Sequence, residues 1–220
     1  MALNRREITD HVVKAGETPA DHFVPPGMQG YTATASLPYD PEEAKRLLAQ
    51  AGYPEGKDMP PVEILFNTSD AHRTIAEAIQ RMWGETLHIE AHLINQDWKV
   101  YLSAMDSLDY GVCRSSWLAD IPDPVNFLEC FLSGVGNNRT GWSSPEYDHL
   151  IQASYEEGDP ARREALLQQA EQRLLAEAPI IPIYFYTWFF LQSPRVQGFT
   201  PNALGYIRWA DLWIAGEGRS

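Results

Sequence analysis

Cysteine and basic residues are scarce in this sequence, and long hydrophobic runs are missing. The 220 residues include two cysteines, Cys113 and Cys130, which are too few for a disulfide framework and lack the spacing of metal ligands. Seventeen Lys and Arg residues stand against thirty Asp and Glu residues, which gives a net charge of −13. Nucleic acids and anionic membrane surfaces both recruit clustered basic side chains. The charge balance therefore argues against either partner.

The hydrophobic segments are too short to cross a bilayer, which takes about 20 consecutive apolar residues. The most apolar stretch, residues 180–191, is interrupted by Pro182. Residues 1–7 contain two arginines and no apolar segment, so we expect no export signal within this chain. Asn4 and Glu7 have the spacing of a capping box. This spacing places the first helix almost at the start, as in a chain cut from a longer protein.

Sequence signatures of catalysis are also missing. The chain has no G-x-S-x-G elbow, no P-loop lysine after a glycine-rich loop and no three-glycine dinucleotide motif. Cys113 follows Val112 in an apolar segment and is expected to be a buried small hydrophobe rather than a reactive thiolate. We therefore expect neither an enzyme nor a bound cofactor.

One group of side chains does have the chemistry of metal ligands. His88, Glu90 and His92 alternate along a predicted strand, which would put all three on one face. Two imidazoles and a carboxylate can hold zinc, and metal-assisted hydrolysis is the enzymatic alternative that they leave open. A half-buried strand also presents alternating polar residues to solvent. We favour this second interpretation, with no metal site.

The composition is typical of a folded domain, with 44% hydrophobic and 21% charged residues. Asp40-Pro41, Ser144-Pro145 and Asp159-Pro160 each combine an N-cap side chain with a first-turn proline, which predicts three helix starts. Apolar spacing predicts further helices over residues 4–15 and 98–105 and from about residue 70, and the helix from residue 159 extends to about 178. Residues 18–39 and 134–144 are expected to be long surface loops.

Strands are predicted between these helices, over residues 62–67, 88–93 and 110–115, and later over 180–190 and 206–214. The first three alternate with helices, which predicts an α/β fold with parallel neighbouring strands. The later strands are expected to make the sheet mixed.

A segment after the third predicted strand combines several kinds of binding chemistry. Residues 114–124 begin just past the end of that strand, where open α/β sheets place ligand sites. Within seven residues the segment offers the cation Arg114, the aromatic ring of Trp117 and the carboxylate of Asp120. The alternative is a proline-rich turn in which Asp120 and Asp123 cap backbone groups and Trp117 packs into the core. The residues alone leave both interpretations open.

Four segments resemble, in order along the chain, stretches of the oligopeptide- and dipeptide-binding proteins of bacterial ABC importers, the family 5 extracellular solute-binding proteins. They are residues 4–8 (NRREI), residues 39–54 (from YDPEEAKRLL to AGYP), residues 134–150 and residues 178–184 (APIIPIY). The ordered set extends over essentially the whole chain and is more specific than any one segment.

The resemblance implies a periplasmic-binding-protein-like lobe, an α/β fold with a mixed central sheet flanked by helices. Members of this family have two lobes that close on a ligand, and the chain resembles only the second, C-terminal lobe, over residues 1–200. Residues 201–220 resemble the terminal strand that crosses back to the first lobe. The implied function is peptide binding for import, with a peptide ligand, the missing first lobe and a membrane permease as partners. The full-length protein would be periplasmic or a cell-surface lipoprotein.

The resemblance also assigns roles to five positions. Asp120 matches the aspartate that pairs with the free α-amino group of the ligand in oligopeptide binders. Trp117 and Trp98 match tryptophans that line side-chain pockets. Arg114 and His72 match positions that approach the ligand carboxylate in some family members.

The chain differs from some relatives at one position, and two alternative functions remain. Leu118 stands where some relatives have a disulfide-forming cysteine, so both cysteines of this chain are expected to be free. Related proteins on the same scaffold bind nickel complexes, haem or oligosaccharides, which makes a non-peptide solute one alternative ligand. A self-associating interaction module is the other alternative, in which residues 206–214, with Trp209 and Trp213, pair with a second copy.

Overall fold

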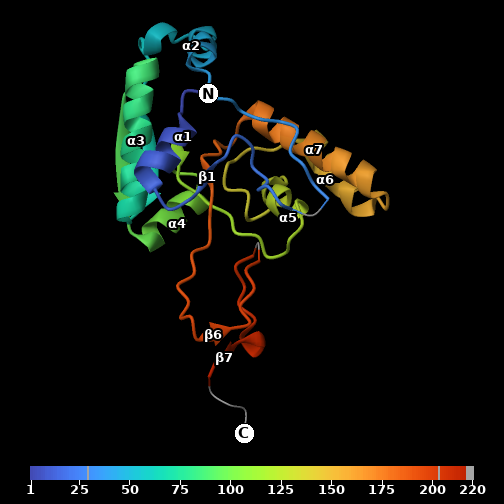
Figure 1. The fold of residues 1–220 in the computed structure, drawn as a ribbon. Coiled ribbons are helices and arrows are strands. Elements are labelled where there is room, and N and C mark those ends of the chain that lie inside the picture. The colour runs from blue at the N-terminus through green and yellow to red at the C-terminus, as the bar shows by residue number, and fades with distance from the viewer. Residues whose placement is uncertain (29, 203, 217–220) are drawn as a thin grey trace.

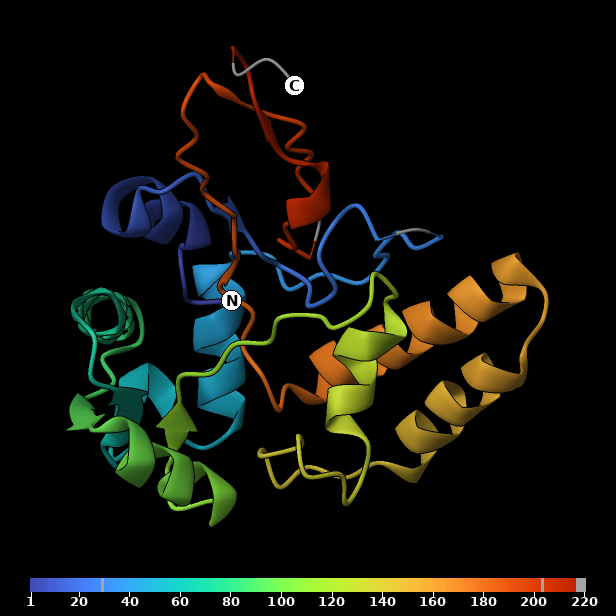
Figure 2. The ribbon, with the colours of Figure 1, turned by 90° about the horizontal axis from the view of Figure 1, so that it is seen from below.

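The computed structural model describes residues 1–28, 30–202 and 204–216. Figure 1 shows a half that carries the main sheet, a half built of helices, and a C-terminal extension that projects away from both. Long connecting segments pass between the two halves, as the view from below shows (Figure 2). Among the described residues, no helix is both long enough and apolar enough to span a bilayer.

A three-stranded parallel sheet forms the centre of the first half. β2 (Val62–Asn67) lies between β3 (Ala91–Gln96) and β4 (Val112–Cys113), and the helices α3 (Asp70–Leu87) and α4 (Trp98–Asp106) connect them. Successive residues of a strand point to opposite faces, so Phe66 is buried with Ala76 under α3 and Leu65 with Met105 under α4. The predicted order of strands and helices, with parallel pairing, is confirmed.

Helices of the second half surround one large core. They are α5 (Val125–Leu128), the 3₁₀ turn η3 (Glu129–Phe131), α6 (Pro145–Glu156) and α7 (Pro160–Glu177). Leu128, Tyr147 and Leu174 are fully buried where these helices meet. Figure 2 shows α6 and α7 lying side by side, with α5 against them.

Part of the predicted surface loop at residues 18–39 is packed into this helical core, where Val24 and Tyr31 are buried. The carboxylate of Glu171 on α7 is itself fully buried. It accepts hydrogen bonds from the backbone N–H groups of Phe23 and Val24, at 2.9 and 2.7 Å, and from the Tyr31 hydroxyl. A buried carboxylate requires such donors, so they fix the loop to α7. The prediction of a surface loop is wrong for this part of the segment.

The predicted helix starts agree with the structure. Asn4, Asp40, Ser144 and Asp159 each accept a hydrogen bond from the backbone N–H three residues later, at distances between 2.9 and 3.4 Å. The first helix is shorter than predicted: α1 (Arg5–Glu7) passes into the π-helical segment η1 (Ile8–Val13). It ends at Lys14, whose φ of 59° lies in the left-handed region. The remaining helices of the half that carries the main sheet are α2 (Pro41–Gln50) and the 3₁₀ turn η2 (Pro54–Gly56).

The later strands do not join the parallel sheet. β5 (Tyr184–Phe185) pairs antiparallel with β1 (Thr18–Pro19), and β6 (Val196–Gln197) pairs antiparallel with β7 (Trp213–Ile214). Pro19 and Pro182 lack the backbone N–H that a longer ladder would need. The α/β lobe is thus confirmed, but within the described ranges the expected mixed sheet is a parallel sheet with two separate antiparallel pairs.

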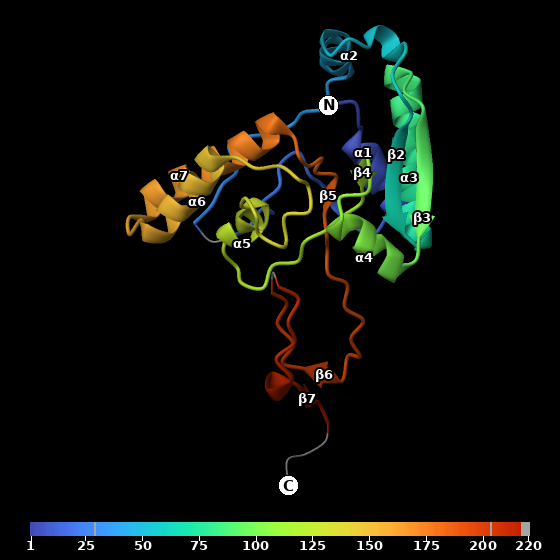
Figure 3. The same cartoon turned by 180° about the vertical axis from the view of Figure 1, so that it is seen from behind.

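The C-terminal extension exposes many large apolar side chains. It leaves the body after β5 and carries β6, the 3₁₀ turn η4 (Trp209–Asp211) and β7 away from the helices (Figures 1 and 3). The exposed side chains include Tyr186, Trp188, Phe189, Phe190, Leu191, Tyr206, Trp209, Trp213 and Ile214. Apolar surface of this extent is typical of an interaction surface. The extension includes residues on both sides of the predicted boundary at residue 200. Within the predicted terminal segment 201–220, residues 203 and 217–220 lie outside the described residues.

Candidate ligand-binding site

Three of the predicted site residues follow the carboxyl ends of the parallel strands. His72 is in the first turn of α3, after β2, and Trp98 is the first residue of α4, after β3. Arg114 comes directly after β4. The carboxyl ends of parallel strands lie at one edge of a sheet, where α/β folds bind their ligands. The topology therefore brings together residues that are far apart in the sequence.

Trp98 and Arg114 are joined through Tyr101. The Tyr101 hydroxyl donates a hydrogen bond to the carbonyl of Arg114. The ring of Trp98 stacks on Tyr101, with the centroids 5.6 Å apart and the planes 26° apart. Trp98 is 56% exposed, while the backbone N–H of Arg114 donates to the carbonyl of Leu65 in β2 at 2.8 Å. Tyr101, which is hydrogen-bonded to this fixed strand end, thus supports one face of the exposed Trp98 indole.

Arg114 and His72 lie beside one small cavity. His72, Tyr184 and Tyr186 line this cavity of about 210 Å³, and the guanidinium of Arg114 donates to the Tyr186 hydroxyl at 2.5 Å. Burial, and then the positive charge of Arg114, lower the pKa of His72 from its ordinary value of 6.5. The neutral imidazole is therefore favoured more strongly than in a free histidine. Arg114 makes no ion pair with any described residue, so its charge is available to an anionic ligand.

Trp117 lies three residues further along, in the segment that crosses to the helical half. Figure 2 shows this segment, between β4 and α5, passing from one half to the other. Trp117 is partly buried against the helical core, which agrees in part with the alternative interpretation of a core tryptophan. Its indole N–H, however, is buried without a hydrogen-bond partner in the described chain. Trp117 therefore packs into the core and also keeps a polar atom available.

Asp120 and Asp123 have different surroundings, although both were candidates for backbone caps. Asp123 accepts a hydrogen bond from the backbone N–H of Val125 at 2.8 Å and forms an ion pair with Arg163 at 2.9 Å. Asp120 is exposed. Its carboxylate takes part in no hydrogen bond or ion pair within the described residues. The structural role thus falls to Asp123, and the carboxylate of Asp120 remains available for a ligand.

Two strand-end amides extend the site beyond the sequence prediction. Asn67 ends β2 and Gln96 ends β3, and the two residues are partners in the parallel register. Register partners point to the same face of a sheet, here the face covered by α4. The side-chain oxygens Asn67 Oδ1 and Gln96 Oε1 are buried and have no hydrogen-bond partner among the described residues. Because such atoms are costly to leave unpaired, they favour a polar ligand at this edge.

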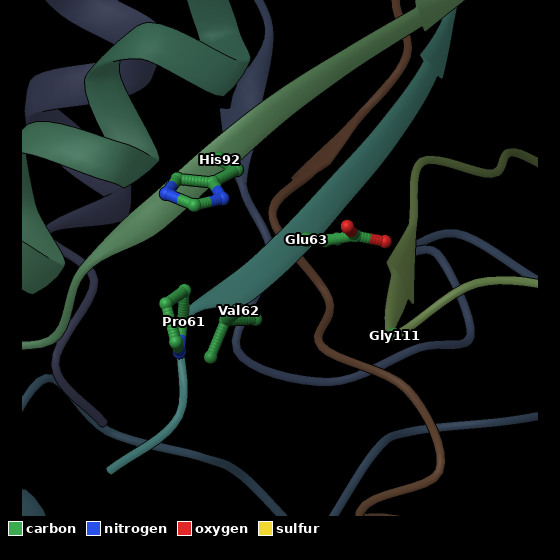
Figure 4. A pocket seen from close by; sticks show the side chains of 5 residues that line it. All are labelled: Pro61, Val62, Glu63, His92 and Gly111. Carbon is green, nitrogen blue, oxygen red and sulfur yellow. The ribbon is translucent and has the colours of Figure 1, made fainter. Parts of the chain in front are cut away.

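The opposite, amino edge of the sheet carries the residues of the predicted zinc alternative. A cavity of about 510 Å³ lies there, lined by Pro61, Val62, Glu63, His92 and Gly111. In Figure 4 the side chains of Glu63 and His92 project from the neighbouring strands β2 and β3. His92 Nε2 and Glu90 Oε1 are in hydrogen-bond contact at 2.9 Å on the exposed surface.

The strand prediction over residues 88–93 was displaced, because β3 begins at Ala91. His88 is instead the C-cap of α3, with a left-handed φ of 56°, and its N–H donates to the carbonyl of Trp83. His88 therefore does not share a strand face with His92. In the part of the chain that the structure describes, no three His, Cys, Asp or Glu side chains are grouped closely enough to hold a metal ion.

Cys113 and Cys130 are both unpaired, as predicted. Burial raises the pKa of the Cys130 thiol to about 12. Burial also raises the pKa of Cys113, which lies in β4 next to Arg114. Burial thus disfavours the thiolate form of both cysteines. Cys113 is only half-buried, whereas the sequence predicted a buried side chain.

Known proteins match the chain over nearly its whole length. It is 38% identical to the dipeptide-binding protein of Bacillus subtilis over 96% of its own residues and 41% of that protein. It is 33% identical to the probable deoxycholate-binding periplasmic protein of Escherichia coli, over 95% of its own residues and 40% of that protein. The chain thus spans about two fifths of the length of these relatives.

The fold and a family model agree with these matches. The structure of the murein tripeptide-binding protein of Escherichia coli superposes with a TM-score of 0.85 at 33% identity, over 97% of this chain and 43% of that one. Residues 1–139 match the model of the bacterial extracellular solute-binding proteins, family 5 middle region. The chain therefore belongs to the family 5 extracellular solute-binding proteins.

Proposed function

We propose that the chain is one ligand-binding lobe of a peptide-binding protein that serves ABC-type import. One observation carries the proposal: the Asp120 carboxylate is exposed and unpaired in the described chain, on the same segment as Arg114 and Trp117. Such a carboxylate forms a charge-assisted hydrogen bond with the α-ammonium group of a peptide. The names of the dipeptide- and murein tripeptide-binding relatives support a peptide ligand.

The expected ligand is a short peptide with a free N-terminus. Its two ends carry opposite charges. Its ammonium group would pair with Asp120, and its carboxylate would approach Arg114 and His72. Trp98 and Trp117 would form flat walls for ligand side chains, which accept many residue types without selecting one. The remaining contacts would be to the peptide backbone, as in strand addition. Sequence preference is therefore expected to be low.

A second lobe would complete this site by hinged closure around the ligand. The exposed aromatic side chains of the extension support its packing against that lobe, with residues 201–220 crossing to it. A membrane permease would receive the peptide, and the chain would carry out no catalysis of its own. The whole protein would act in the periplasm or as a cell-surface lipoprotein. The lobe alone should bind peptides with millimolar affinity or weaker, because half the contacts are lost while immobilising the ligand still costs about 4–15 kcal/mol.

A non-peptide solute is the second candidate ligand. The likeness to the probable deoxycholate-binding protein supports it, and nickel complexes, haem and oligosaccharides belong to the same class of alternatives. Deoxycholate, haem and oligosaccharides carry no α-ammonium group, so their binding would not require the pairing of such a group with Asp120.

Self-association is the other candidate function, supported by the exposed apolar side chains of residues 206–214. Gel filtration at several concentrations tests it. A concentration-dependent size that disappears when residues 206–220 are deleted would favour an interaction module over a peptide-binding lobe.

The peptide proposal is tested by amide-shift NMR titration with a mixture of tripeptides. We expect shifts near Trp98, Arg114, Trp117 and Asp120, which are lost in Asp120→Ala and on N-acetylation of the peptides. Shifts that survive both changes would contradict the assignment of the ammonium group to Asp120. No shifts at millimolar peptide would contradict a share of the peptide site on this lobe, because either the second lobe then supplies the decisive contacts or the ligand is not a peptide.

A further inference from the structure

Three side chains in series connect Asp120 to the helical half of the molecule. The backbone N–H of Asp120 donates to Asn126 Oδ1 at 2.8 Å. The other amide atom, Asn126 Nδ2, donates to Glu129 Oε1 at 2.9 Å. Glu129 Oε2 in turn accepts from the hydroxyl of Tyr155, on α6, at 2.6 Å. We call these three side chains (Asn126, Glu129 and Tyr155) the Asn126 relay.

The amide of Asn126 is suited to this position by its chemistry. Asn126 is only 7% exposed, and it lies between an N–H donor and a carboxylate acceptor. A side-chain amide offers an acceptor and a donor on the same carbon atom. A carboxylate in its place would repel Glu129, and an aliphatic side chain would leave the N–H of Asp120 and the oxygen of Glu129 without their partner.

A second anchor holds the other end of the same short segment. The carboxylate of Asp123 accepts from the backbone N–H of Val125 and from Arg163 Nη2, which lies 2.9 and 3.0 Å from its two oxygens. Arg163 also donates to the carbonyl of Ser154, at 3.2 Å. The backbone is thus fixed at Asp120 and at Asp123, while the carboxylate of Asp120 stays exposed.

We infer that Asn126 is a positioning residue for Asp120, held in turn by Glu129 and Tyr155. It fixes the backbone from which the carboxylate of Asp120 is presented to the ammonium group of a ligand. This inference rests on the proposed function, because it requires that pairing. It extends the proposed function by assigning part of the selectivity for a free N-terminus to side chains that do not touch the ligand. A charge on a fixed backbone binds more tightly than one that must first be ordered.

The test compares Ala-Ala-Ala with N-acetyl-Ala-Ala-Ala by amide-shift titration of the 220-residue chain. The readout is the ratio of the two dissociation constants, acetylated over free. We expect a ratio of about 10 or more in the unchanged chain, since hydrogen bonds to charged groups contribute this much. Asp120→Asn should lower the ratio to about 1, and Asn126→Ala to about 3 or less. In the Asp120→Asn background, Asn126→Ala should change the ratio no further.

Asn138→Ala is the matched control. The amide of Asn138 donates to the carbonyls of Phe131, Leu132 and Trp142, at 2.9 to 3.2 Å, in the connection between η3 and α6. It makes no hydrogen bond to the segment of Asp120 among the described residues. The control should lower thermal stability and leave the ratio unchanged. If Asn126→Ala does not fold, Tyr155→Phe, at the 49% exposed end of the relay, takes its place. Tyr155→Phe should lower the ratio by a smaller factor than Asn126→Ala.

The outcomes separate this inference from the proposed function. If Asp120→Asn lowers the ratio and the relay variants do not, the positioning role is wrong and the proposed function stands. If the unchanged chain has a ratio near 1, or Asp120→Asn keeps the full ratio, the pairing with the ammonium group is wrong and the positioning role fails with it.

Discussion

The two edges of the parallel sheet carry similar side chains in different arrangements. At the amino edge, the side chains of His92 and Glu90 contact each other, and no Phe, Tyr or Trp lines the cavity there. At the carboxyl edge, His72 and Arg114 are not paired with any described carboxylate, and Trp98 is exposed nearby. The amino-edge cavity is the larger, at about 510 Å³ against about 210 Å³. Cavity volume therefore favours the amino edge as the ligand site, and the unpaired charged and polar side chains favour the carboxyl edge.

Helix direction explains part of this difference. α3 and α4 both begin at the carboxyl edge, so their positive dipole ends lie there. The Asp97 carboxylate caps the first turn of α4, whereas the N-cap residue of α3, Ser69, makes no side-chain cap hydrogen bond. The C-terminal end of α3, capped by His88, lies toward the amino edge. A ligand carboxylate is therefore favoured at the edge that also carries Arg114. Unpaired polar groups and the size of a hollow thus point to different edges, and our proposal follows the unpaired groups.

Among the changes that distinguish the two edges, Arg114→Ala is expected to have the largest effect on peptide affinity. It removes the cation that we assign to the ligand carboxylate, and hydrogen bonds to charged groups are worth about 1.5–3 kcal/mol. Tripeptide binding should weaken by roughly tenfold or more, while a peptide with an amidated C-terminus should lose less. Amide-shift titration measures both ligands. His92→Ala, at the amino edge, is the control and should leave both affinities unchanged.

The opposite result would reverse the comparison between the edges. If His92→Ala weakens tripeptide binding and Arg114→Ala does not, the ligand occupies the amino edge. Arg114→Lys helps to interpret a loss, because it keeps the charge and removes the planar fork. An intermediate affinity in this variant would show that charge alone supplies part of the binding.

Trp98→Ala should have a smaller effect. One face of the Trp98 indole stacks on Tyr101, and the other offers a flat wall to a ligand side chain. Aromatic contacts of this kind contribute about 0.5–1.5 kcal/mol beyond the area they bury. We expect a loss of a few-fold for Ala-Phe-Ala and less for Ala-Gly-Ala, measured by the same titration. Trp209→Ala, on the extension, is a matched control with a tryptophan that is 73% exposed. Equal losses in both variants would contradict a wall at the carboxyl edge.

The sequence predicted those features that depend on a few neighbouring residues. Asp40, Ser144 and Asp159 cap their helices as expected, because an N-cap bond joins residues three positions apart. The alternation of strands and helices likewise predicted the parallel sheet. The start of β3 was misplaced because His88 takes a left-handed conformation. Glycine is the residue that usually marks such a helix end, and histidine gives no comparable signal.

Features that depend on distant contacts could not be predicted. Asn67 and Gln96 are polar residues at strand ends, but their lack of partners depends on what other segments bring near them. Asp120 and Asp123 have the same side chain in one turn, and only Arg163, forty residues away, shows which of them is structural. A carboxylate on a surface turn is therefore a weak signal until its partners are known.

Protonation of His72 gives the smallest expected effect. Its pKa is held below 6.5 by burial first and by Arg114 second. The folded state thus binds this proton more weakly than the unfolded chain, so His72 lowers stability as the pH falls through 6.5 toward its folded pKa and has no effect above 6.5. Arg114→Ala should raise the pKa of His72 without restoring its ordinary value, because the burial remains, and NMR titration of the imidazole measures this. An unchanged pKa would show that the two side chains do not share one site, which would separate the carboxyl edge into independent parts.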